Sequence, residues 1–298
     1  AALELAADPS FTKGEQIATR AASKTALNAF AKALPALVGG SADLQGPNAV
    51  ALQNTQPFTA ATPEGRYIHF GIREFAMAAI TNGIQLHGGF RAFCATFAVF
   101  SDYLRPALRL AALMRIPSIF VLTHDSIFVG EDGPTHQPVE ILASLRAIPN
   151  VLVLRPADAE ETAVAWRIAL EQRNRPVCLL LSRQNLPVLE KADAAWKQTI
   201  RSGAYIVKDT DGKPDVTVFA TGSEVSLAAA ALASPAKVRV VSVLSKELLE
   251  GDGAAARTQL AGGGNVRVMV AEAGVKQGWE GWVQSPDDIF SIDRFGES

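Results

Sequence analysis

Apolar runs alternate with longer Ala-rich segments along the whole chain. Residues 118–123 (S-I-F-V-L-T) are almost continuously apolar, which is typical of a strand buried on both faces of a parallel sheet. Residues 16–34 place apolar side chains at helical spacing and are followed by Pro35, so they predict a helix that ends there. Similar patterns predict strands at 37–40, 91–93, 151–154, 177–181, 216–220 and 238–243, and helices at 139–145, 159–172 and 225–233.

The order of these elements predicts an α/β fold with two domains. A chain of 298 residues is long enough for both. Residues 1–190 form the predicted first domain, which contains the parallel sheet. Residues 191–203 form the predicted linker, because they carry a mixed-charge run and end in a glycine. Residues 204–298 form the second, smaller α/β domain.

One acidic residue stands out in the otherwise apolar segment 69–103. Glu74 precedes an Ala-rich stretch, which predicts a buried helix with a carboxylate in its first turn. Phe97, Phe100 and Tyr103 follow three residues apart, which predicts that they share one face of a helix that continues to Met114. A carboxylate buried among aromatic rings is unfavourable unless it is paired or protonated. A heteroaromatic ring with a basic nitrogen would meet both needs, although rings at this spacing are also typical of an ordinary core.

A polar, Gly-rich loop follows the strand predicted at 118–123. It contains His124, Asp132 and His136, and Arg183 follows the strand predicted at 177–181. Open α/β sheets bind ligands at the carboxyl ends of their strands, so these side chains are candidate ligand contacts. A loop with only a structural role remains an alternative. A metal site is less favoured, because the loop has no pair of histidines four residues apart and no cysteine at zinc-ligand spacing.

The overall composition narrows the possible partners. The net charge is −2 and the pI is about 6.1, so no basic surface indicates nucleic acid or an anionic membrane as a partner. No apolar run is long enough to span a bilayer. The two cysteines, Cys94 and Cys178, lie in apolar segments and are predicted to be reduced core thiols. We expect a cytoplasmic protein.

The motifs G-I-R-E-F-A-M and A-T-F-A-V-F-S-D-Y resemble the pyrimidine-binding domain of transketolase. In that family the glutamate that matches Glu74 activates thiamine diphosphate by bonding a nitrogen of the aminopyrimidine. The resemblance implies that Phe97, Phe100 and Tyr103 form the aminopyrimidine pocket. The motif G-G-S-A-D-L also matches the family, and it implies that Asp43 lies near the cofactor and the subunit contact.

Further motifs that match transketolase carry the implied substrate contacts. The motif H-D-S-I-F-V-G-E-D-G-P-T-H-Q-P implies that Asp132 recognises a hydroxyl near the ketose carbonyl. By the same motif His136 is a catalytic residue at the first hydroxyl and carbonyl of the donor, and His124 lies farther along the sugar channel. The motifs I-A-T-R and S-R-Q-N imply that Arg20 and Arg183 bind the substrate phosphate, which suits the guanidinium group.

The sequence also departs from the transketolase pattern. Pro47 stands where the family has a serine that binds substrate phosphate, and proline offers neither a hydroxyl nor an N–H group. Ile141 stands where relatives commonly carry a histidine. The segments A-T-G-S-E-V, A-E-A-G-V-K-Q-G-W-E and I-D-R-F-G-E-S resemble the C-terminal domain of the family, and the N-terminal diphosphate-binding domain has no counterpart in this sequence.

We therefore expect this chain to hold an incomplete active site, as half of a split enzyme or as a fragment of a longer chain. The diphosphate and its Mg²⁺ or Ca²⁺ would belong to a partner domain or subunit in a homodimer or heterotetramer, with no metal ligand in this chain. The complete enzyme would move a two-carbon ketol unit from a ketose phosphate to an aldose phosphate. Three alternatives remain: a deoxyxylulose phosphate synthase, a β-type subunit of a 2-oxoacid dehydrogenase, and a non-catalytic assembly or regulatory fragment. The first two should lack G-E-D-G-P-T-H-Q-P.

Overall fold

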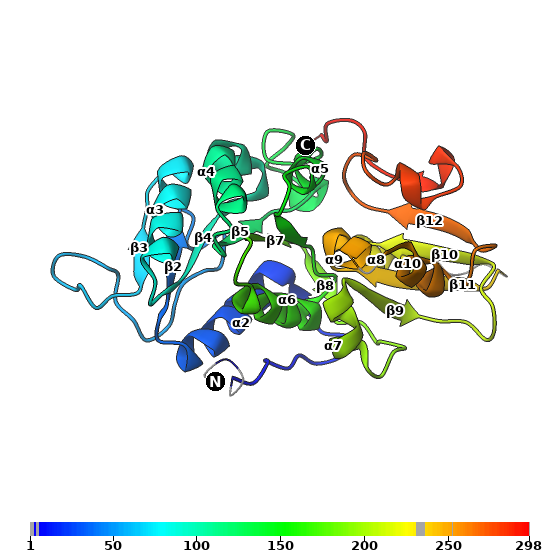
Figure 1. Cartoon of the computed structure of the whole chain (residues 1–298), viewed down its shortest axis with the longest axis horizontal. Helices are drawn as coiled ribbons and strands as arrows, with labels where there is room; N and C mark the ends of the chain where they lie inside the picture. Colours follow the sequence, from blue (N-terminus) through cyan, green and yellow to red (C-terminus); the bar gives the residue numbers. More distant parts are fainter. Residues whose placement is uncertain (1–2, 4–5, 231–235, 252, 298) are drawn as a thin grey trace.

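The chain forms two α/β units that lie next to each other (Figure 1). The computed structural model describes residues 3, 6–230, 236–251 and 253–297. Within this part of the chain, no helix is both long and apolar enough to cross a lipid bilayer.

The first unit is built on a six-stranded sheet in which all neighbouring strands are parallel. Its strands, in spatial order, are β3 (Tyr67–His69), β2 (Leu37–Ser41), β4 (Arg91–Phe97), β5 (Ile119–Thr123), β7 (Val177–Leu181) and β6 (Leu152–Leu154). Its helices are α2 (Thr19–Ala33), α3 (Glu74–His87), α4 (Ser101–Leu113), α5 (Ile141–Arg146) and α6 (Ala159–Glu171). Helices α2 and α6 cover one face of the sheet, and α3, α4 and α5 cover the other (Figure 1).

Strand β5 shows why its sequence is continuously apolar. Ile119 and Val121 belong to the core cluster formed with α2 and α6, whereas Phe120 and Leu122 belong to the cluster formed with α3, α4 and α5. Alternate side chains of a strand point to opposite faces, so a sheet covered on both faces needs apolar residues at every position. Each of these fully buried side chains contributes about 1.5–3 kcal/mol relative to exposure.

The second unit contains a five-stranded sheet. Its strands, in spatial order, are β13 (Ile289–Phe290), β12 (Arg267–Ala271), β10 (Val216–Ala220), β11 (Val238–Val243) and β9 (Ala204–Lys208). All neighbours are parallel except β9, which runs antiparallel to β11. The helices described in this unit are α8 (Glu224–Ala230), α9 (Lys246–Gly251) and α10 (Gly253–Ala261). The two observed sheets agree with the predicted α/β class.

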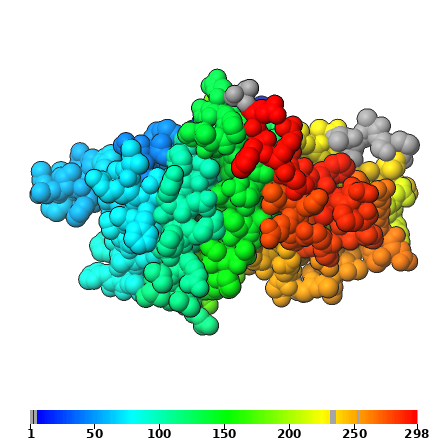
Figure 2. Space-filling view, turned by 90° about the horizontal axis from the view of Figure 1, so that it is seen from above, coloured from blue at the N-terminus to red at the C-terminus, as the bar shows by residue number. Residues whose placement is uncertain are grey.

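The two units share an apolar core. One cluster contains Leu154 and Trp166 from the first unit together with Ala220 and Val240 from the second. The predicted linker contributes helix α7 (Trp196–Thr199), whose first residue is buried in the same cluster. The end of the chain also returns to the first unit, where the side chain of Gln137 donates a hydrogen bond of 3.1 Å to the carbonyl of Glu297. Figure 2 shows this red C-terminal stretch against the green middle of the chain.

Three sequence predictions of local structure are wrong. Residues 16–18 do not begin a helix but form β1 (Gln16–Ala18), which pairs antiparallel with β8 (Asn185–Pro187). Strand β4 extends to Phe97, four residues beyond the predicted end, because it is held between β2 and β5. Phe97, Phe100 and Tyr103 therefore do not share a helix face, since they lie in a strand, a 3-10 turn and helix α4. Of the helix predicted at 225–233, residues 231–233 lie outside the described part.

Candidate active site

The candidate residues gather at the carboxyl edge of the six-stranded sheet. Asp43 follows β2, Phe97 ends β4, His124 follows β5 and Arg183 follows β7. Because β2, β4, β5 and β7 are consecutive neighbours in a parallel sheet, their carboxyl ends form one continuous edge. Arg20 reaches the same edge from the first turn of α2.

Glu74 faces a cavity of about 450 Å³ at this edge. The cavity is lined by Glu74, Asp43, Phe100 and Tyr103, together with Ala42, Leu44 and Ile72. Glu74 begins α3 and is 9% exposed, and within the described residues no hydrogen bond or ion pair to its carboxylate occurs. A nearly buried carboxylate without a partner at the wall of an apolar cavity is well placed to bind a polar group of a ligand.

A series of aromatic rings leads from this cavity toward the histidines. The ring of Phe100 lies 6.2 Å from that of Tyr103 and 5.7 Å from that of Phe97, to which it is nearly parallel. Phe97 in turn stacks on His124 with centroids 3.8 Å apart. His136 meets Phe100 edge-on at 5.5 Å. Phe97 supports the ring of Phe100 and contacts both histidines, but it is not among the residues that line the cavity.

His124 has an unusual backbone and a perturbed imidazole. Its φ angle is 62°, in the left-handed region that non-glycine residues seldom adopt. Its Nδ1 lies 2.8 Å from the Thr123 hydroxyl, which itself donates to Asn48. Burial lowers the pKa of His124 to about 4, and the nearby Arg20 and Arg183 act in the same direction. The imidazole is therefore neutral at pH 7.

Two arginines form a positive region beside His124. Arg20 donates from Nη1 to the carbonyl of Pro47 at 3.0 Å and from Nε to the carbonyl of Arg183 at 3.5 Å. Burial and the neighbouring charge of Arg183 lower the pKa of Arg20. Arg183 is exposed, and its ion pair with Glu131 is long, at 3.9 Å. Two positive side chains that lie near each other, with few nearby negative charges to balance them, favour the binding of an anionic ligand.

The remaining predicted residues lie on the loop after β5. Nδ1 of His136 is 2.8 Å from the hydroxyl of Thr135, and Asp132 is exposed on the same loop. The negative charge of Asp132 partly opposes the lowering of the His124 pKa, so the two side chains are electrostatic neighbours. The buried amide of Gln137 donates to the carbonyl of Gly130 at 2.7 Å and closes the loop.

Several features of the site had no signal in the sequence analysis. The contact between the Pro47 carbonyl and Arg20 depends on backbone geometry. The side chain of Asp125, next to His124, bonds to Arg155, which is far along the chain. Ile141 is a core residue of α5 and does not reach the site. Within the part of the chain that the structure describes, no group of three or more His, Cys, Asp or Glu side chains could hold a metal ion.

Comparison with known proteins matches both units to one family. Residues 15–188 match the pyrimidine-binding domain of transketolase, and residues 203–298 match the transketolase-like C-terminal domain. Transketolase from Treponema pallidum is 63% identical over 292 residues, which is 97% of this chain and 44% of the relative. The chain thus spans less than half the length of the curated relatives that it matches.

Solved structures agree with these matches. Transketolase from Leishmania mexicana superposes with a TM-score of 0.90 at 43% identity, covering 97% of this chain and 42% of that protein. A structure described as a split gene transketolase, inactive beta4 tetramer, has a TM-score of 0.67 at 28% identity and covers 87% of this chain and 80% of that one. The predicted resemblance is confirmed.

Proposed function

Because the chain belongs to the transketolase family, we propose that it supplies the pyrimidine-binding side of an active site for ketol transfer. The complete assembly would move a two-carbon ketol unit from a ketose phosphate to an aldose phosphate. The observation that carries this proposal is the unpaired carboxylate of Glu74 in a cavity that Phe100 and Tyr103 also line.

The residues around this cavity suit the aminopyrimidine of thiamine diphosphate. Phe100 and Tyr103 offer aromatic surface to a flat ring, and Phe97 supports Phe100 from behind. Glu74 can share a proton with a basic ring nitrogen, which would give the buried carboxylate the partner it lacks. Asp43 lines the same cavity and would lie beside the cofactor. When bound, the cofactor would supply the carbon nucleophile and the electron sink for the two-carbon unit.

The positive region and the histidines would bind the sugar phosphate. Arg20 and Arg183 would hold the phosphate end. His124, neutral at pH 7 because of its low pKa, would accept or donate a hydrogen bond to a sugar hydroxyl without adding charge. His136 meets the ring of Phe100, which lines the cavity, and would contact the reacting end of the donor there as a catalytic residue. Asp132 would recognise a neighbouring hydroxyl.

The rest of the active site would come from a partner. The matched relatives extend well beyond the part that this chain covers. A diphosphate-binding domain, on another polypeptide or on a longer form of this chain, would hold the diphosphate together with Mg²⁺ or Ca²⁺. The split gene transketolase, described as an inactive beta4 tetramer, supports a partner on a separate polypeptide. We propose that the complete assembly is a homodimer or a heterotetramer. We propose that residues 1–190 and 204–298 are the two domains and that residues 191–203 are the linker between them. We also propose that the protein is located in the cytoplasm.

The proposal is tested by reconstitution. The chain is mixed with a separately expressed diphosphate-binding domain, thiamine diphosphate and Mg²⁺, and ketol transfer from xylulose 5-phosphate to ribose 5-phosphate is measured. Glu74→Gln keeps the size of the side chain but removes the carboxylate, so we expect activity to fall by a factor of about 10²–10⁴, the usual contribution of a proton-transferring side chain.

The matched control is Glu64→Gln, which makes the same change on an exposed loop. It should leave both activity and folding unchanged. An unchanged rate for a folded Glu74→Gln variant would refute the role of Glu74. A mixture that stays inactive although both proteins are folded and associate would support a non-catalytic fragment instead.

A further inference from the structure

Arg155 is a completely buried cation that connects the two units. It follows β6 in the first unit, and its Nε donates to Oδ2 of Asp125 at 2.8 Å. Its Nη1 donates to the carbonyl and the hydroxyl of Thr221 at 3.0 and 2.8 Å and also to the carboxylate of Glu224. Thr221 follows β10 and Glu224 begins α8 in the second unit. One guanidinium thus binds both units simultaneously.

Its partner in the first unit is the residue next to His124. Asp125 is 3% exposed, and Arg155 is the one side chain in the described part of the protein that donates a hydrogen bond to its carboxylate. On the other side of His124, Thr123 is held by pairing with β4 and β7 and by its bond to Asn48. A left-handed non-glycine residue persists only where its surroundings determine it. The bonds of Thr123 and Asp125 provide such surroundings for His124.

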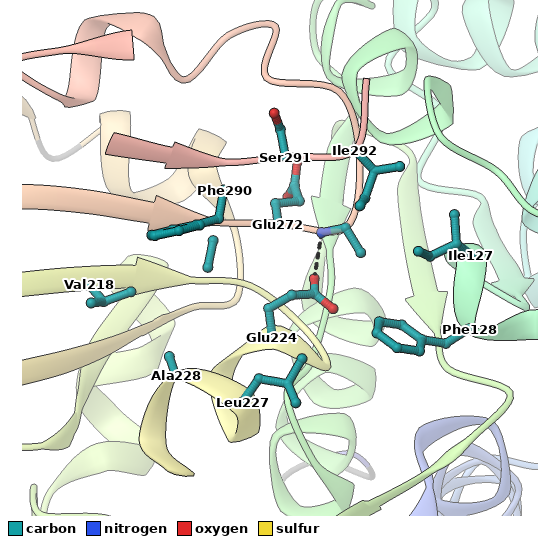
Figure 3. Close-up of a pocket in the computed structure, with 12 residues that line it drawn as sticks. Ile127, Phe128, Val218, Glu224, Leu227, Ala228, Glu272, Phe290, Ser291 and Ile292 are labelled. Atoms are coloured by element: carbon teal, nitrogen blue, oxygen red, sulfur yellow. Dashed lines mark hydrogen bonds between the residues drawn. The ribbon is translucent and has the colours of Figure 1, made fainter. Parts of the chain in front are cut away.

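The second unit holds Arg155 rigidly. Glu224 also accepts hydrogen bonds from the backbone N–H of Ala273 at 2.9 Å and from the hydroxyl of Ser223 at 2.5 Å. Figure 3 shows the Glu224 carboxylate directed at this backbone N–H, at the wall of an apolar cavity lined also by Phe128. A Cβ atom on Gly222 would lie 2.7 Å from the guanidinium carbon of Arg155, so the turn closes tightly around the cation.

We propose that Arg155 is a positioning residue: through Asp125 it fixes the backbone turn that holds His124 against Phe97, and so couples this side chain to the docking of the second unit. Among the described residues, the second unit contributes no side chain to the cavity of Glu74, but through Arg155 it determines where His124 lies. The functional meaning of this coupling rests on the proposed role of His124 in the sugar channel. The coupling itself rests on the bonds described above.

The test follows the imidazole of His124 in the full chain. Histidine ring signals are recorded by ¹H–¹⁵N NMR across a pH titration, and the His124 signal is identified by its loss in His124→Gln. The groups that act on its charge are Arg20 from α2, Arg183 after β7, and Asp132 and His136 on the loop. In Arg155→Lys one ammonium nitrogen replaces both Nε, which bonds Asp125, and Nη1, which bonds Thr221, so the variant cannot keep the geometry of both bonds. We expect the ring to gain water and its midpoint, about 4 in the native chain, to rise by at least about one pH unit.

Arg146→Lys is the matched control. Arg146 lies in the same buried network, where it binds both oxygens of Glu272 at 2.7 and 2.8 Å, and in the described structure it forms no hydrogen bond or ion pair with Asp125. A merely structural role would predict that both variants lose stability and that neither moves the midpoint of His124. An unchanged His124 signal in folded Arg155→Lys, or an equal change in Arg146→Lys, would overturn the proposal.

A second variant covers the case in which Arg155→Lys does not fold. Asp125→Asn leaves the bonds of Arg155 to Thr221 and Glu224 in place and weakens only the connection to His124, so it should shift the same signal. In the reconstituted assembly the KM for the ketose phosphate should rise several-fold while kcat changes less. Because the NMR measurement needs neither cofactor nor partner, a shifted signal in an inactive mixture would refute the proposed function alone. An unshifted signal in an active mixture would refute the positioning role alone.

Discussion

Replacing Glu272 by glutamine should strongly destabilise the junction between the two units. This carboxylate belongs to a residue that is only 3% exposed, and it accepts hydrogen bonds from both Nη atoms of Arg146, from the indole N–H of Trp279 at 3.0 Å and from the hydroxyl of Thr221 at 2.8 Å. Glutamine has nearly the same shape but no charge. The substitution therefore removes the bidentate carboxylate partner of buried Arg146 and leaves it only the Glu247 carboxylate, whose nearest oxygen lies 3.9 Å from Nε.

The magnitude can be worked out in two ways. Burial alone would raise the pKa of Glu272, but the charges and hydrogen bonds of Arg146, with help from Arg155 and Trp279, lower it to about 2 from the ordinary 4.5. At about 1.4 kcal/mol per pH unit, this difference corresponds to about 3 kcal/mol. Breaking a buried ion pair by removing one partner costs about 3–5 kcal/mol. The two values agree, and either is a large part of the 5–15 kcal/mol that is typical of a folded protein.

The assay is urea-induced unfolding followed by circular dichroism, at pH 7 and at several lower pH values. A carboxylate with a lowered folded-state pKa stabilises the protein above its unfolded pKa and loses this effect as the pH falls. We expect Glu272→Gln to unfold with about 3 kcal/mol less free energy at pH 7. The difference from the native chain should shrink as the pH falls from about 4.5 toward about 2.

The control is Glu280→Gln, in which the same change is made at an exposed carboxylate of the second unit. It should change the free energy of unfolding by less than about 0.5 kcal/mol. A loss below about 1 kcal/mol for Glu272→Gln at pH 7, or a difference from the native chain that does not vary with pH, would refute this account of the junction.

Two other predictions follow from the site and the junction. Pro47→Ser adds a hydroxyl beside the Arg20 guanidinium. In the reconstituted assembly, the KM for a phosphorylated acceptor should therefore fall several-fold relative to the KM for a non-phosphorylated one. An unchanged ratio of these two KM values would contradict the prediction. Burial, and next the charge of Asp158, raise the pKa of Glu161 to about 7, while the Tyr205 hydroxyl donates to its carboxylate at 2.8 Å. Because the carboxyl pKa is raised in the folded state, the native chain loses stability as the pH rises from about 4.5 to about 7. The free energy of unfolding of Glu161→Gln should therefore rise relative to that of the native chain between pH 5 and 8. Urea unfolding that gives a constant difference between the two proteins over this range would exclude this prediction.

The sequence predicts the central strands well because strands buried on both faces are apolar at nearly every consecutive residue. Strands β7, β10 and β11 have the predicted bounds, and β5 begins only one residue later than predicted. Edge elements are harder to predict. The three-residue strand β1 has no pattern of its own, since it exists only by pairing with β8, which comes more than a hundred and fifty residues later. The helical spacing of Phe97, Phe100 and Tyr103 was misleading, because a turn after β4 brings the rings into contact without a shared helix face.

For the site, the sequence identified single residues but not how they are connected. Glu74, His124 and His136 belong to local motifs that can be read in a few consecutive residues. Their relation through stacked rings depends on the turn of the chain after β4 and on the left-handed residue after β5. The network of Arg155 was not visible at all. Its charged members lie on loops and at the start of a helix, in both units, and no spacing along the sequence relates them.

Apolar contacts and buried ion pairs at the junction between the two units contribute differently to stability and to the relative position of the units. The shared apolar cluster supplies most of the driving force, but apolar contacts have little directionality and tolerate small displacements. A buried ion pair adds little net stability over apolar residues of the same size, because desolvation offsets most of the attraction. It is, however, very sensitive to displacement, since a charge that loses its partner stays buried. The Arg155 and Arg146 networks therefore act mainly to select one relative position of the two units, and that position is the one in which Asp125, and with it His124, is held in place.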